Sequence, residues 1–179
     1  ISLEGRRFWI LGLLPLRRDQ IVWSKFLFSV AGSLPPCCLL ILLSDRMLGL
    51  PGKAILLHEI ACVTLCIGLS GIAVGLGALI PDLREASPSK IAAGFGGTLS
   101  LVLSSLFIMP VVLAAGLPFH AEAAITALGS SWPWLAAILG LFTAGSGVAV
   151  SVGVLCVLGL FAGGTPLMLG IRSFRRLEA

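Results

Sequence analysis

The sequence has few charged side chains and no tyrosine. Of its 179 residues, 12 are Lys or Arg and 8 are Asp or Glu, which together make 11% of the chain, whereas 58% are hydrophobic. A soluble globular domain has roughly a quarter of its residues charged and fewer than half apolar. The scarcity of charge therefore excludes a soluble globular protein.

The few charges leave four long stretches that contain no Asp, Glu, Lys or Arg. These stretches cover 26–44, 60–81, 91–119 and 123–171, with 19, 22, 29 and 49 residues. A helix needs about 20 apolar residues to cross roughly 30 Å of hydrocarbon. The sequence thus predicts an all-α, polytopic membrane helix bundle with about four transmembrane helices.

The last stretch is too long for one straight membrane helix. Residues 133–171 would extend about 58 Å, nearly twice the hydrocarbon thickness. A break is expected at Gly163–Pro166 rather than at Gly145–Gly147, because proline has no backbone N–H to donate. Pro110 is likewise expected to end or kink the third helix. The predicted spans lie near 26–44, 60–81, 91–110 and 135–162, between a cytoplasmic segment 1–25 and a basic tail 172–179.

The basic residues give these spans an orientation. Five lie in residues 1–25, two in 82–90 and three in the tail, against two in 45–59 and none in 120–122. Four spans place 10 of the 12 on one face, which the positive-inside rule assigns to the cytoplasm together with both ends of the chain. A two-span hairpin in 123–171 would weaken the split to 7 against 5, so four spans are favoured. Because the basic residues flank spans instead of forming one stripe, no nucleic-acid partner is expected.

Small residues recur at four-residue spacing inside the stretches. In lipid, helices associate where small residues let their backbones approach. The spacing therefore predicts close helix packing. It is found in Gly71/Gly75, Ala92/Gly96, Gly145/Ala149/Gly153 and Gly159/Gly163.

The chemistry that the sequence lacks is equally informative. No ionisable residue lies in the middle of any stretch, whereas ion-coupled carriers and intramembrane proteases need such groups. Gly94-Phe95-Gly96-Gly97 lacks the GK[ST] ending of a nucleotide-binding loop. Ser87-Pro88-Ser89-Lys90 fits the S-x-x-K of acylating serine enzymes without its companion motifs, and a serine before proline is also a good helix N-cap. We therefore expect no enzyme activity and an energy source outside this chain.

One set of residues has the spacing of a metal site. His58, Cys62 and Cys66 lie at i, i+4 and i+8, on one face of a helix, and their soft ligand atoms suit a metal. However, Cys62 replaces the second histidine of H-E-x-x-H, and cysteine is commonly a buried small hydrophobe. We therefore favour the interpretation that these residues pack in the helix bundle, and no metal is expected. The five cysteines also indicate no disulfide framework.

The N-terminal segment has a different character from the spans. The apolar run 8–14 is too short to cross a bilayer and lies between two arginine pairs. A short helix at the cytoplasmic interface, ended by Pro15, fits this pattern. Trp23 and Lys25 then mark the start of the first span. Since the chain begins with Ile1 and has no signal-peptide pattern, we expect it to be the C-terminal part of a longer protein.

Two blocks of this sequence resemble the permeases of ATP-binding-cassette (ABC) exporters of the type-two kind. The first block is E-G-R…P-L…I-V…K within residues 4–25. The second comprises Gly75–Asp82, Pro88–Ala92 and Gly94–Thr98, and is similar to a bacterial subgroup of these permeases. Beyond Leu99 the match is only of general character.

The resemblance implies roles for individual residues. In that family the first block is a coupling helix that docks on a separate ATPase subunit. Its carried-over coupling residues are Glu4, Gly5, Arg7, Trp9 and Pro15, with Lys25 as the boundary residue. The second block contributes Pro81, Asp82, Pro88, Gly94, Gly96 and Gly97.

The resemblance also implies a function. The chain would be a permease subunit in the bacterial inner membrane that moves an unidentified substrate, while the ATPase partner binds ATP and this chain holds no cofactor. It would act as a dimer or within a longer permease that has further spans upstream. An alternative is a non-transporting membrane scaffold or assembly factor that recruits a cytoplasmic partner through the basic segment. An intramembrane enzyme ranks third, because the spans lack ionisable groups.

Overall fold

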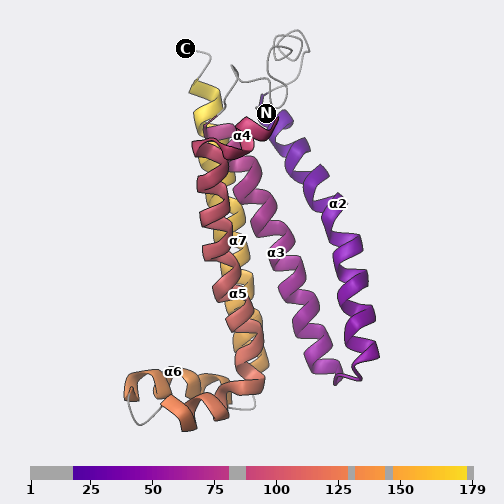
Figure 1. The fold of residues 1–179 in the computed structure, drawn as a ribbon, viewed down its shortest axis with the longest axis vertical. Coiled ribbons are helices and arrows are strands. Elements are labelled where there is room, and N and C mark those ends of the chain that lie inside the picture. Colours follow the sequence, from indigo (N-terminus) through magenta and orange to yellow (C-terminus); the bar gives the residue numbers. More distant parts are fainter. Residues whose placement is uncertain (1–17, 81–87, 129–131, 144–146, 177–179) are drawn as a thin grey trace. The chain divides into compact units, whose positions relative to one another are not determined.

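The computed structural model describes residues 18–80, 88–128, 132–143 and 147–176. Every regular element in these ranges is a helix, which confirms the predicted all-α class (Figure 1). The helices are α2 (Arg18–Met47), α3 (Gly52–Leu79), α4 (Pro88–Ala93), α5 (Phe95–Leu128), α6 (Pro133–Thr143) and α7 (Gly147–Arg176).

Four of these helices are long and apolar enough to cross a membrane, as predicted. The candidate spans are Asp19–Met47, Gly52–Leu79, Phe95–Ala127 and Gly147–Ser173. The shortest has 27 residues, so each extends at least about 40 Å and exceeds the hydrocarbon thickness. The excess length leaves the polar ends of the helices room to reach the headgroup region.

The first two helices extend beyond their predicted spans. α2 begins at Arg18, so Lys25 lies within it, and α3 begins at Gly52 rather than near residue 60. The connection predicted over 45–59 is therefore only the short turn 48–51. A stretch without charged residues underestimates the length of a helix when the polar residues at the end of that helix find partners in the neighbouring helix.

The third predicted span also differs from the structure. The short helix α4 is followed by a bend at Gly94, and α5 then runs from Phe95 to Leu128 with Pro110 inside it. Of the two outcomes expected at Pro110, an end or a kink, the end is wrong, because residues 111–119 continue α5. A proline inside a membrane helix is tolerated where neighbouring groups compensate for the lost hydrogen bond.

The predicted fourth span, 135–162 with a break at Gly163–Pro166, is wrong. α7 continues through Pro166, and the separate helix α6 ends at Thr143. At 11 residues, α6 extends only about 16 Å and is too short to span. In Figure 1 it lies across the direction of the adjoining part of α7. Trp132 and Trp134, with ring centroids 5.7 Å apart, lie at the start of α6 and not at the start of a span.

The chain divides into two compact units, each of which contains parts of α2, α3, α5 and α7. The first unit comprises residues 1–33, 66–107 and 160–179. Its core unites one residue from each of three helices, Val22, Ala78 and Leu167. The side chains of Phe26, Val74 and Ile171 pack against this core.

The second unit comprises residues 34–65 and 108–159 and contains α6. Its buried apolar side chains are small or aliphatic apart from Phe142. They come from α3, α5, α6 and α7, and include Leu57, Ala61, Val111, Ala114, Leu139 and Leu155. Ser151 is fully buried in this unit, and its hydroxyl makes no hydrogen bond to any residue that the structure describes.

Candidate functional site

A tight turn joins α2 to α3 in the second unit and fixes which residues of the two helices face each other. Gly49 has a φ of 66°, a conformation that glycine adopts without strain. The Gly49 N–H donates to the carbonyl of Arg46 at 3.2 Å, and the Leu50 N–H donates to that of Asp45 at 3.1 Å. These bonds form a Schellman cap, and Pro51 then leads into α3. The two helices consequently run antiparallel.

The turn brings Asp45 of α2 and His58 of α3 together. Asp45 Oδ2 lies 2.9 Å from His58 Nδ1, within hydrogen-bonding distance. The aspartate side chain is 8% exposed and the histidine 36%. Because burying an unpaired carboxylate is costly, His58 is the group that makes the buried position of Asp45 tolerable.

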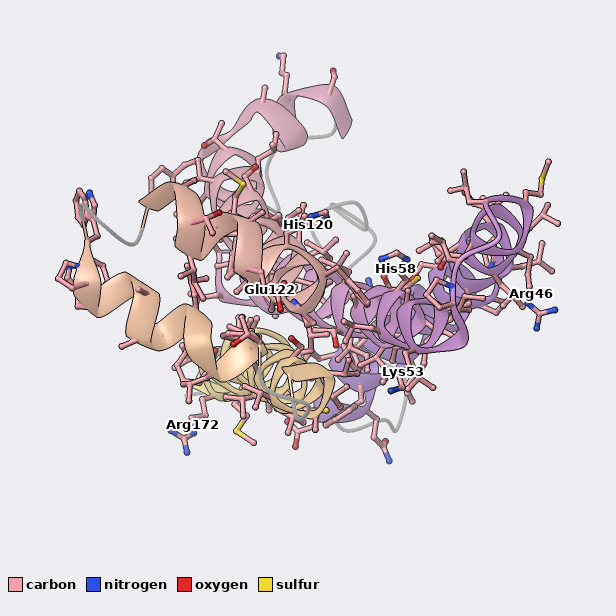
Figure 2. All side chains as sticks on the ribbon, turned by 90° about the horizontal axis from the view of Figure 1, so that it is seen from below. Arg46, Lys53, His58, His120, Glu122 and Arg172 are labelled. Atoms are coloured by element: carbon pink, nitrogen blue, oxygen red, sulfur yellow. The ribbon has the colours of Figure 1, made fainter. Side chains whose placement is uncertain are left out.

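Other charged residues of the hairpin have different surroundings. Arg46 and Lys53 are exposed, and Figure 2 shows Lys53 on the side of α3 opposite to His58. Glu59 Oε1 is buried without a hydrogen-bond partner among the described residues. This end of the hairpin therefore combines one satisfied polar pair with one unsatisfied carboxyl oxygen.

A second side-chain contact joins the same two helices further from the turn. Cys38 Sγ of α2 lies 3.9 Å from Cys62 Sγ of α3. The set His58, Cys62 and Cys66 is thus divided among different partners, since His58 contacts Asp45. Within the described residues, no group of three or more His, Cys, Asp or Glu side chains is placed to hold a metal ion.

In the first unit, α3 and α7 are in close backbone contact. A Cβ on Gly71 would overlap the backbone of Gly163, and one on Gly75 would overlap that of Pro166. A Cβ on Gly170 would lie 2.5 Å from the carbonyl oxygen of Gly75. We call these five residues the glycine seam. The contacts advance in the same direction along both helices, so α3 and α7 run parallel and only residues without a larger side chain fit between them.

The glycine seam explains why α7 does not break at Pro166. The backbone of this proline packs directly against α3, so that continuing the helix preserves a large contact. Thr165, the residue just before the proline, donates a 2.6 Å hydrogen bond from its hydroxyl to the carbonyl of Phe161, one turn earlier in the helix. The tendency of Pro166 to break the helix is outweighed here by the packing of α7 against α3.

In the first unit, the hydroxyls of Ser29 on α2 and Ser70 on α3 form a hydrogen bond 2.9 Å long. We expect Ser29→Ala or Ser70→Ala to destabilise the protein by only about 0.6 kcal/mol, the average for such bonds in membrane proteins. Thermal unfolding in detergent would show this as a shift of about 2 °C in Tm. A loss of the folded protein would contradict the assignment of a minor role.

The coupling residues predicted from the first block lie almost entirely outside the described residues. Glu4, Gly5, Arg7, Trp9 and Pro15 are there, as are Pro81 and Asp82 of the second block. Lys25 is on α2, about two turns after its start. The remaining second-block residues cluster at the start of the third long helix, where Pro88 begins α4, Gly94 forms the bend, and Gly96 and Gly97 lie in the first turn of α5.

Sequence reasoning missed the pairing of Asp45 with His58. Both residues were placed in a connection over 45–59, where no contact between them was expected. Gly49 followed by Pro51 is the signal that could have found it, because Gly at the end of a helix and Pro shortly after it mark a sharp turn. A short turn between two long helices brings the last turn of the first helix, which contains Asp45, close to the first two turns of the second, which contain His58.

Comparison with known proteins relates the whole chain to one family. No curated protein and no solved structure matches the sequence. A family model described as "Putative ATP-binding cassette" matches residues 1–179. The chain, whose described residues include four candidate membrane spans, therefore belongs to this ATP-binding-cassette family.

Proposed function

We propose that this chain is a permease subunit of an ATP-driven exporter and has no enzymatic activity of its own. The observation that carries the proposal is the occurrence of four candidate membrane spans in a chain of an ATP-binding-cassette family. The family description names the cassette and no permease, so the permease role rests on these helices and on the two resembling blocks. A separate ATPase subunit would bind ATP and supply the work.

The distribution of charge supports an energy source outside this chain. The described stretches 26–44, 60–80, 95–119 and 147–171 contain no ionisable side chain apart from cysteine thiols. Carriers driven by ions or protons need acidic or basic groups in the membrane, whereas a permease driven by an attached ATPase does not. ATP-driven closure of the partner would move the N-terminal segment and shift the helices between inward- and outward-facing states.

The positive-inside rule supports an orientation for this permease. With residues 1–25, 82–90 and 172–179 in the cytoplasm, the basic residues concentrate where an ATPase partner would dock. The turn at Gly49 would then face the outer side of a bacterial inner membrane. The same orientation suits a scaffold that recruits a cytoplasmic partner, so the test must separate docking from energy coupling.

The test uses substitutions at two of the coupling residues. The full-length protein is reconstituted in lipid vesicles with its ATPase subunit. We expect the permease to stimulate ATP hydrolysis, and we expect Glu4→Ala and Trp9→Ala to reduce both this stimulation and co-purification of the ATPase. Ser2→Ala, outside the block, is the matched control and should behave as the parent protein.

The outcomes separate the two functions. Stimulation that is unaffected by both substitutions, with unchanged co-purification, would remove the coupling role. Co-purification without any stimulation by the parent protein would identify a scaffold instead of a permease.

A further inference from the structure

The two thiols that face each other across α2 and α3 form a pair of soft ligands inside the second unit. Their sulfur atoms are 3.9 Å apart, nearly twice the roughly 2.05 Å of a disulfide bond. Two metal–sulfur bonds as long as those of zinc thiolates, about 2.3 Å each, span at most about 4.6 Å. The observed separation therefore accommodates a metal ion between the two sulfurs with only a small adjustment of the side chains.

We propose that Cys38 and Cys62 bind one soft monovalent cation of the Cu(I) or Ag(I) type as a two-coordinate site. Thiol sulfur prefers soft ions, and among the described residues no group of three or more His, Cys, Asp or Glu side chains is placed to hold a metal ion. The tetrahedral geometry that Zn(II) requires is therefore not offered. The site is independent of the proposed permease function.

Burial determines the protonation state of the occupied site. Cys62 is 4% exposed and Cys38 is partly buried. Each lies about 15 Å along its helix from the turn. A net charge at this depth is costly. When M⁺ binds, one S–H bond breaks, an S–M bond forms, the second sulfur coordinates as a neutral thiol, and one proton passes to water. The site is then neutral before and after binding.

In the second unit, the acidic and basic groups of the α2–α3 hairpin lie toward the turn from the two thiols. The other acidic and basic residues on these segments of α2 and α3 are Asp45, Arg46, Lys53, His58 and Glu59, which all lie nearer the turn. Asp45 and His58 already contact each other. Since metal ions compete with protons for thiolates, binding should weaken as the pH falls, by about tenfold per unit for one released proton.

The test measures Cu(I) binding by the full chain, kept reduced and anaerobic in detergent micelles. A coloured chelator of Cu(I) serves as competitor, and Ag(I) is a second, redox-inert probe. We expect one ion per chain and one proton released per ion. Cys38→Ser and Cys62→Ser should each weaken binding by at least about 10- to 100-fold, the loss that even outer-shell changes cause at metal sites.

Matched controls exist in the same chain. Cys156→Ser removes an exposed thiol on α7, and Cys37→Ser removes the neighbour of Cys38; both should bind as the parent protein does. Size-exclusion profiles establish that each variant remains folded. Undetectable Cu(I) binding by the parent chain, or undiminished binding by the Cys38→Ser/Cys62→Ser double variant, would overturn the proposal. Zn(II) binding as tight as that of Cu(I) would refute the two-coordinate geometry.

Discussion

Gly71→Ala is expected to be one of the two most destabilising glycine-to-alanine substitutions in α3. The new Cβ would overlap the backbone of Gly163, and backbone cannot rotate away as a flexible side chain can. The helices would have to separate along the whole glycine seam. Overpacking of this kind costs about 1–3 kcal/mol, which corresponds to a decrease in Tm of roughly 2–12 °C for a chain of this size. Gly75→Ala should act similarly, because its Cβ would overlap Pro166.

The same helix supplies the control for this prediction. A Cβ on Gly77 would meet no atom within 4 Å, so Gly77→Ala should leave Tm unchanged or raise it slightly, since alanine is the better helix former. On α7, Gly163→Ala and Gly164→Ala form a second matched pair, because only Gly163 lies against α3. Thermal unfolding in detergent, followed by the fraction that remains monodisperse, measures all of these variants. Equal Tm values for Gly71→Ala and Gly77→Ala would show that the seam is not tightly packed.

Asp45→Ala should have the next-largest effect after the substitutions in the glycine seam, because it removes the buried member of a polar pair. The substitution leaves His58 Nδ1 without the carboxylate 2.9 Å away. Leaving a buried polar group unsatisfied costs about 1–3 kcal/mol in soluble proteins, whereas hydrogen bonds in membrane proteins contribute about 0.6 and at most about 1.7 kcal/mol. Since His58 is partly exposed and can find water or headgroup partners, we expect a loss near 1–2 kcal/mol.

A double-mutant cycle isolates the contribution of this pair. The single variants Asp45→Asn and His58→Gln are compared with the double variant by unfolding in detergent. A coupling free energy of about 0.6–1.7 kcal/mol is expected if the two side chains interact directly. Arg46→Ala, an exposed neighbour on α2, should have almost no effect. Strictly additive effects of the two substitutions would show that the pair does not stabilise the hairpin.

The sequence could predict the class of this fold because lipid acts on each helix separately. Every span must satisfy its own backbone hydrogen bonds, so an apolar stretch of sufficient length is a helix whatever its neighbours are. The number of long apolar helices followed from this rule, as did the expectation of close contacts at Gly71, Gly75 and Gly163. The coupling segment before Arg18 stays a prediction, since it lies outside the described residues.

The ends and breaks of the helices were decided by tertiary contacts. Pro166 carries a strong local signal for a break, yet α7 continues because its backbone lies against Gly75 of α3. Asp45 and His58 carry the polarity of a connecting loop, yet both are helical because they satisfy each other. Such contacts form between residues distant in sequence, and no local pattern contains them.

Composition by itself was enough to predict about four helices long and apolar enough to cross a membrane, because the cost of placing charge in hydrocarbon depends on each residue alone. The tertiary structure decided which small residues touch, which thiols face each other and which polar groups pair. Those outcomes depend on the register between helices. In the second unit the turn at Gly49 sets that register, and in the first unit the close approach of α3 to α7 sets it.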